Sequence, residues 1–102
     1  MPFIARYILR RLTVTAICET VCGIISRAEE AWAKRRYEAH FISKLTDCDG
    51  ENSETDSSLD FARDCGFITD DQHRALVLMS QEIGKMLGSM IKNPGPFLIS
   101  DR

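Results

Sequence analysis

The plainest helical signature in the chain lies in residues 69–92, TDDQHRALVLMSQEIGKMLGSMIK. Thr69 and Gln72 have the spacing of a capping box, and the two aspartates between them add the negative charge that favours a helix N-terminus. Five apolar residues then recur at spacings of three and four, namely Leu76, Met79, Ile83, Met86 and Met90. The sequence therefore predicts a helix over 70–92 with an apolar seam.

A second stripe on the same helix carries small residues. Ser80, Gly84 and Gly88 are spaced by four, and a glycine inside a helix costs about 1 kcal/mol relative to alanine. Two glycines on one line indicate that another backbone comes close, so these residues are predicted to pack against a helix or a second subunit. Residues 93–102 begin with Asn-Pro-Gly-Pro, which ends the helix, and are expected to form a loose tail.

Toward the N-terminus, a short connection and a polar segment precede this helix. Gly66 can adopt a positive φ and close the preceding helix, so the two helices should be antiparallel. Residues 47–58, DCDGENSETDSS, have the polar composition of a loop. A helical period nevertheless runs through this segment and its flanks, at Phe41, Leu45, Cys48, Asn52, Thr55, Leu59 and Ala62. We predict one helix over about 37–64, with Asn52 and Thr55 on its inner side and a weak point near Gly50.

The first third of the chain shows the same period. Eight residues fit one seam if Arg10 interrupts it: Phe3, Tyr7, Val14, Ile17, Val21, Ile24, Ala28 and Ala31. Gly23 is the strongest helix breaker in this part, and the β-branched run 13–15 is an alternative place for a turn between two helices. No alternating strand pattern or hairpin dipeptide occurs, so the predicted class is all-α.

Length and charge limit the other possibilities. The chain has 102 residues, of which 44% are hydrophobic, and is predicted to form a single domain over 1–102 with its core in 3–92. Residues 1–46 hold eight Lys and Arg against four Glu, whereas residues 47–102 hold five against eleven Asp and Glu. This polarity favours complementarity between helices or subunits over a basic face for a phosphate-rich partner.

The segments that direct a protein to membranes or organelles are not evident. No apolar run reaches the roughly 20 residues of a membrane-spanning helix. Arginines interrupt the apolar start that a signal peptide needs, and residues 1–18, although they lack acids as transit peptides do, are better explained as a plain helix. The four cysteines are expected to be free core residues. We expect a cytoplasmic protein without a membrane partner.

The candidate chemical sites are weak. Glu51 and Glu54 lie three residues apart and could bind a metal or transfer protons, but no Glu-x-x-His motif accompanies them. They are interpreted as contacts between helices or subunits. The spacing within 47–58 does not match an EF-hand, and the Cys18/Cys22 pair lacks the second pair of a zinc site. We expect no metal, no cofactor and no enzymatic activity.

The best candidate for a nucleic-acid contact is the cluster Lys34, Arg35 and Arg36, with Trp32 and Tyr37 beside it. Cations bind phosphates, and aromatic rings stack on unpaired bases. Three adjacent cations, however, point around a helix rather than along one face, and Trp32 is equally suited to packing. Binding of RNA or DNA is therefore the alternative hypothesis.

Several segments resemble a bacterial protein family. FISKL (41–45), ENSET (51–55), Leu59 and DCGFIT (64–69) are similar to the elements F-I-x-K-L, E-A-x-E-T, W-L and G-Y-I of the four-helix bundle proteins encoded in 23S ribosomal RNA intervening sequences, and of their free-standing relatives. The last helix, with IGKML and SMI, is also similar, and the resemblance covers roughly residues 31–92. Asn52 and Ser58 stand where the family has alanine and tryptophan.

The resemblance implies an antiparallel up-down bundle of the four-helix type, or a bundle whose N-terminal helix pair is shortened or fused. It also implies a closed homo-oligomer, often a pentamer, without established enzymatic activity, and a related bundle binds nucleic acid beside reverse transcriptases. With an apolar seam on every helix, the chain has more hydrophobic surface than one small bundle can bury, and a closed assembly would bury it. The chain is thus expected to be a homo-oligomeric assembly or binding module. The alternative is a nucleic-acid-binding accessory protein that uses its basic face on RNA, a ribonucleoprotein or a reverse transcriptase.

Overall fold

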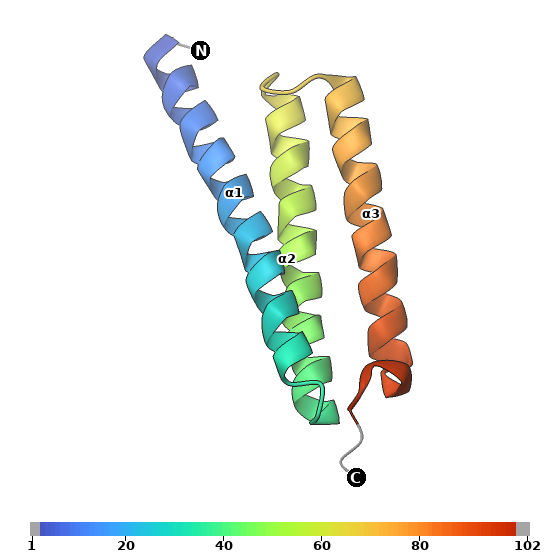
Figure 1. Ribbon diagram of the computed structural model, residues 1–102. Helices are drawn as coiled ribbons and strands as arrows, with labels where there is room; N and C mark the ends of the chain where they lie inside the picture. Colours follow the sequence, from blue (N-terminus) through green and yellow to red (C-terminus); the bar gives the residue numbers. More distant parts are fainter. Residues whose placement is uncertain (1–2, 100–102) are drawn as a thin grey trace.

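The computed structural model describes residues 3–99 as three long helices and one short 3-10 helix (Figure 1). Helix α1 spans Phe3–Ala33, α2 spans Glu38–Asp64, α3 spans Asp70–Lys92, and η1 spans Gly95–Phe97. No strand occurs among these residues, so the all-α prediction is confirmed. Three helices rather than four make up this part of the chain, as in the alternative with a fused N-terminal pair.

The three helices lie side by side, with α2 between its neighbours (Figure 1). Helix α2 makes the main tertiary contacts with both α1 and α3. The Cα trace extends over 63 × 22 × 13 Å, so the molecule is long and flattened. In such an arrangement the two outer helices each have one packed side, and the remaining sides face solvent.

Helix α2 follows the predicted period along its whole length. Its buried residues are Phe41, Leu45, Cys48, Asn52, Thr55, Leu59 and Ala62. The helix passes through Gly50 without interruption, so the expected weak point is not present. The polar segment 47–58 is helical because each of its inward positions is buried between two other helices, and such packing supplies most of the stability of a helix in a protein.

Helix α1 is continuous, and the alternative of a turn at residues 13–15 is wrong. Thr13 is buried, and its hydroxyl donates to the carbonyl of Leu9 at 2.8 Å. The predicted seam is only partly correct: Ala31 is buried and Ile17 and Ile24 are half-buried, but Tyr7, Val14, Val21 and Ala28 are exposed. The side chain of Phe3 lies outside the described part. The face that packs on α2 is rotated away from the predicted seam.

Helix α3 begins as predicted. The Thr69 hydroxyl accepts from the Gln72 amide at 3.1 Å, and the Gln72 side-chain oxygen accepts from the Thr69 amide at 2.9 Å. Gly66 has a φ of +74°, which closes α2 and reverses the chain. The capping box, the glycine turn and the antiparallel arrangement of α2 and α3 are therefore confirmed.

The apolar seam of α3 does not face α2. Leu76, Met79 and Met86 are exposed, and only Ile83 and Met90 pack partly against the core. Ser80 and Gly84 of the small stripe face α2 instead, because their size lets the two helices approach closely, whereas Gly88 is exposed. The predicted apolar seam of α3 is thus largely open to solvent.

The core lies toward the end of the molecule that carries the α1–α2 turn. It contains Ala31, Phe41, Leu45, Cys48 and Leu87. Phe97 and Leu98 pack against it, and the amide of Ile99 donates to the carbonyl of Arg35 at 3.2 Å. The tail is therefore packed as far as residue 99, contrary to the loose tail expected, and its last three residues lie outside the description. None of the described helices is long and apolar enough to cross a membrane.

Candidate functional site

A reciprocal pair of hydrogen bonds joins α2 to α3. The Asn52 amide donates to the Ser80 carbonyl at 3.0 Å, and the Ser80 hydroxyl donates to the Asn52 amide oxygen at 3.2 Å. Both residues are only 5% exposed. A Cβ on Gly84 would lie 3.5 Å from the Asn52 side-chain nitrogen, whereas one on Gly88 would meet nothing within 4 Å. Ser80 and Gly84 thus pack helices within one chain, and Gly88 is exposed.

A second set of polar contacts joins α1 to α2. The Thr55 hydroxyl donates to the Thr20 hydroxyl at 2.9 Å, and the Cys48 thiol donates to the Ile24 carbonyl at 3.3 Å. Burial raises the pKa of the Cys48 thiol, and the negative charges of Asp49 and Glu51 raise it further. The thiol therefore stays protonated, and Cys48 acts as a small core residue. All four cysteines are free, but Cys18 and Cys22 are exposed, so the expectation that they are core residues is wrong.

The two predicted acidic residues lie in different surroundings. Glu51 is half-buried against α1, where a Cβ on Gly23 would come within 2.8 Å of its carboxyl carbon. Glu54 is exposed. Glu51 therefore occupies the space that glycine leaves in α1, and Glu54 lies on the surface. Within residues 3–99, no three His, Cys, Asp or Glu side chains gather closely enough to hold a metal ion.

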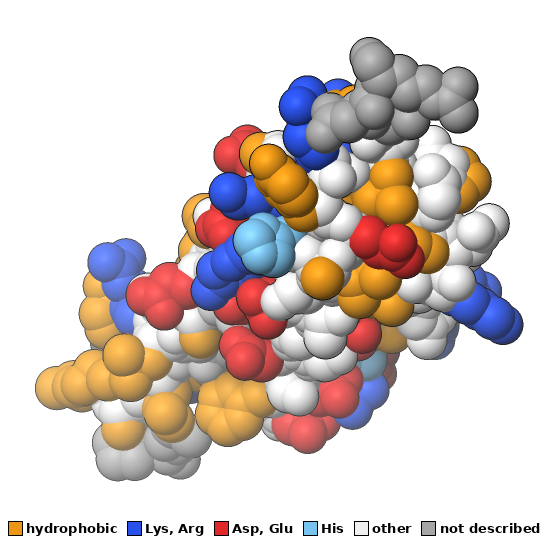
Figure 2. Space-filling view, turned by 90° about the horizontal axis from the view of Figure 1, so that it is seen from below, with side chains coloured by type: hydrophobic (Ala, Val, Ile, Leu, Met, Phe, Trp, Pro, Cys, Tyr) orange, Lys and Arg blue, Asp and Glu red, His pale blue; other side chains and the backbone are white. Residues whose placement is uncertain are grey.

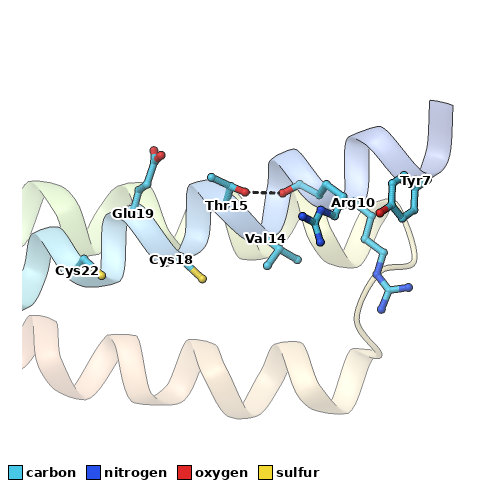
Figure 3. A pocket seen from close by; sticks show the side chains of 8 residues that line it. Tyr7, Arg10, Val14, Thr15, Cys18, Glu19 and Cys22 are labelled. Atoms are coloured by element: carbon cyan, nitrogen blue, oxygen red, sulfur yellow. Dashed lines mark hydrogen bonds between the residues drawn. The ribbon is translucent and has the colours of Figure 1, made fainter. Parts of the chain in front are cut away.

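Helix α1 carries a long stripe of exposed residues, here called the α1 stripe. Its members are Ile4, Tyr7, Arg11, Val14, Cys18, Val21, Ile25, Ala28 and Trp32. Among them, Ile4, Tyr7, Val14, Val21, Ile25 and Trp32 are between 41% and 72% exposed. An open hollow of about 790 Å³ follows α1 from Tyr7 to Cys22. In Figure 3, Val14 and Cys18 project to one side of the helix and Thr15 and Glu19 to the other.

A second hollow joins α1 to α3 beside the core. It has a volume of about 520 Å³, and Ala28 and Trp32 of α1, Phe41 of α2, and Leu87 and Met90 of α3 contribute to its walls. The exposed apolar residues of α1 and α3 therefore border one open side at this end of the molecule. Figure 2 shows several groups of hydrophobic side chains at the surface, with acidic and basic side chains between them.

The sequence profile of the family described as 23S rRNA-intervening sequence protein matches residues 14–89. The chain belongs to this family. The matched region contains all of α2, most of α1 and most of α3. No curated protein and no solved structure gave a match. The resemblance inferred from residues 31–92 is confirmed, and the match extends further toward the N-terminus.

The predicted nucleic-acid cluster forms the end of α1 and the turn into α2. Lys34 is exposed, and Arg36 is exposed and engaged with another group of the protein. The guanidinium of Arg35 lies 3.9 Å from the centre of the Trp32 ring and donates to the Trp32 carbonyl at 3.1 Å. One face of the indole is therefore covered by Arg35, which leaves less of the ring for a base.

The α1 stripe is the surface that sequence reasoning missed. Its residues alternate at spacings of three and four, as a helical seam does, but so do the residues of the seam that was predicted on the same helix. The two patterns share Tyr7, Val14, Val21 and Ala28. The spacing of the α1 stripe was therefore visible in the sequence. Which of the two patterns packs against α2, however, depends on tertiary packing.

Proposed function

We propose that this chain is a non-enzymatic assembly module that works by self-association through its helices. The observation that carries the proposal is the exposure of the α1 stripe. A helix that is apolar around most of its circumference is normally covered on more than one side. Here α2 covers one side of α1, and the apolar residues of the α1 stripe are exposed.

The open side between α1 and α3 supports the same function. Met79 and Met86 of α3 are exposed at positions that continue the face of Met90, which contributes to the hollow beside the core. Large contiguous apolar patches on a small protein mark interaction sites. Together the two outer helices present more apolar surface than one copy can bury.

Light scattering coupled to size-exclusion chromatography, at two protein concentrations, tests this function. The mass of one chain is 11.5 kDa. We expect a mass of at least two chains that persists on dilution into the micromolar range. A mass of one chain at every concentration would contradict the proposal.

A second candidate function is binding of RNA through the turn between α1 and α2. Lys34 and Arg35 bring cations next to the exposed Trp32 and Tyr37, which favours a single-stranded ligand. Binding through phosphates would weaken as salt is raised. Replacement of Lys34 and Arg35 by glutamate should abolish binding of a labelled RNA oligonucleotide, and Lys92→Glu on α3 is the control. Binding that ignores both salt and these charges would exclude this candidate.

A further inference from the structure

We propose that Cys18 and Cys22 of α1 form a binding site for one soft monovalent cation, Cu(I) or its analogue Ag(I), which the two thiolates hold in a two-coordinate arrangement. The inference goes beyond the proposed self-association and does not depend on it. It gives a role to two side chains that the core does not use.

The two cysteines are exposed on one face of a continuous helix. Free cysteine is among the most buried residue types, yet neither Cys18 nor Cys22 lies in the core. Residues at positions i and i+4 lie one turn apart on the same face of a helix. Both cysteines line the open hollow along α1, and Figure 3 shows their side chains on the same edge of the helix. Packing within the chain therefore does not account for this pair.

The helical spacing favours a bridging ion over a disulfide bond. Side chains four residues apart in a helix have Cβ atoms about 5–6 Å apart. A disulfide needs Cβ atoms about 3.5–4.5 Å apart, so the pair cannot form one while α1 keeps its helical geometry. A zinc–thiolate bond is about 2.3 Å long, and an ion of similar size would join two sulfur atoms about 4.6 Å apart. Rotation of two exposed side chains about their Cα–Cβ bonds can provide this separation.

The number of ligands selects the class of ion. Within residues 3–99, no third His, Cys, Asp or Glu side chain joins Cys18 and Cys22 in a group of three. Zinc is almost always bound by three or four protein ligands, so two thiolates alone make a poor zinc site. Thiolates select soft cations such as Cu(I). Monovalent cations with a filled d shell are stable with two ligands in line, which is the coordination that this pair offers.

The charges around the pair are compatible with such a complex. Binding replaces the two thiol protons by one monovalent ion, so two protons are released and the complex carries one negative charge. Arg10 and Arg11 line the same hollow and supply positive charge on this part of α1. Glu19, which lies between the two cysteines in the sequence, projects to the other side of the helix (Figure 3). Its carboxylate is therefore turned away from the thiols.

The site overlaps the surface assigned to self-association. Cys18 belongs to the α1 stripe, and Cys22 lies beside it. Another copy seated on the stripe would compete with the ion, so the apparent affinity for Cu(I) should rise when an assembly is diluted until it dissociates. In a chain that is monomeric at every concentration, the affinity should not change on dilution. Failure of the proposed function would therefore leave this inference intact.

Competition with a chromophoric Cu(I) chelator such as bicinchoninate, without oxygen, tests the site in the full chain. We expect one Cu(I) per chain to be retained, with the ultraviolet charge-transfer band of a copper–thiolate bond, and Zn(II) not to be retained. Two linked ligands hold an ion about 10²–10⁴ times more tightly than one, so Cys18→Ser and Cys22→Ser should each weaken retention at least about 100-fold. Cys65→Ser is the control and should retain Cu(I) like the wild type.

A variant with changed spacing separates a paired site from general thiol reactivity. Cys22→Ser combined with Ile25→Cys keeps two exposed thiols on α1 but places them about 10.5 Å apart along the helix axis. It should hold Cu(I) no better than Cys22→Ser alone, with unchanged far-ultraviolet circular dichroism. Retention equal to that of the wild type, in this variant or in either serine variant, would overturn the inference. So would a Cys18–Cys22 disulfide that forms under mild oxidation without loss of helix.

Discussion

Helix α2 is more polar than α1 but more deeply buried, whereas α1 is more apolar but more exposed. Helix α2 contains eight acidic residues and a run of twelve mostly polar ones, yet seven of its side chains are buried. Helix α1 is rich in Ile, Val, Leu and aromatic residues, yet most of these are exposed. The central position of α2 gives it two neighbours, while α1 has one. In this molecule, the number of neighbouring helices decides how many side chains of a helix are buried, and its mean hydropathy matters less.

Buried polar residues of α2 help to fix the positions of α1 and α3 against it. Asn52 and Thr55 occupy inward positions and direct hydrogen bonds to α3 and α1 respectively. Buried polar groups tolerate few alternative arrangements, because an unpaired group loses its hydrogen bonds to water without replacement. The comparison therefore predicts that substitutions inside α2 destabilise a single chain, whereas substitutions on the outer side of α1 change association instead.

The largest effect should come from Phe41→Ala. Phe41 is fully buried, whereas Phe61 on the same helix is 46% exposed. Loss of a buried phenylalanine side chain should lower the free energy of unfolding by about 3–5 kcal/mol, and urea denaturation measures it. Phe61→Ala is the matched control and should cost much less. Equal losses in the two variants would show that α2 is not buried as described.

A smaller loss is expected from Asn52→Ala. The substitution leaves the Ser80 hydroxyl buried without its partner, which should cost about 1–3 kcal/mol. The double variant with Ser80→Ala should lose less than the sum of the two single variants, as thermal unfolding can show. Ser53→Ala on the exposed side of α2 is the control. Additive losses would mean that the two side chains do not interact.

Alanine substitution of two glycines should change the free energy of unfolding in opposite directions. A Cβ on Gly50 meets nothing within 4 Å in the middle of α2, so Gly50→Ala should raise stability by about 0.5–1 kcal/mol. Gly66 has a positive φ, and Gly66→Ala should lower stability by about 1 kcal/mol because L-residues are strained there. Chemical denaturation of both variants is the measurement. Destabilisation by Gly50→Ala would indicate that α2 is interrupted at this point.

The smallest effect concerns the ion pair between α1 and α2. The Lys44 ammonium lies 2.9 Å from a Glu30 carboxylate oxygen, and its hydrogen bond lowers the pKa of Glu30. A lowered pKa in the folded state contributes stability that is present above the ordinary pKa and is lost as pH falls through the lowered one. Wild-type protein should therefore lose slightly more thermal stability on acidification than Glu30→Gln. Glu29→Gln is the control, and superimposable profiles for wild type and Glu30→Gln would contradict the assignment.

The sequence predicted local features and the central helix well. Thr69, Gln72 and Gly66 act through their own neighbours in the chain, so the cap and the turn could be recognised without tertiary information. The seven inward positions of α2 could be predicted because only one pattern of period three and four passes through its polar segment. Because the other positions of this segment are polar, only one face of the helix is suited to burial.

The rotation of the two outer helices could not be predicted in the same way. Helix α1 carries two overlapping apolar seams, and α3 carries a Leu/Met seam beside the stripe of Ser80 and Gly84. Each choice satisfies the helical period, and the contact with α2 selects between them. Small residues of α3 were selected because they permit close approach to Asn52. The contact between Arg35 and Trp32 likewise required the turn geometry, although the neighbouring cations were evident in the sequence.

Amide hydrogen exchange of α1 and α2, at one protein concentration above and one below that at which the assembly dissociates, is the most direct test that α1 functions as an association surface. We predict that protection of α1 amides between residues 4 and 32 is greater in the associated protein than in the dissociated chain, while protection of α2 amides changes little. Such a result would place another copy on α1. Equal protection of α1 in the associated and the dissociated protein would contradict the account, because it would mean that the exposed side of α1 is not covered by a partner.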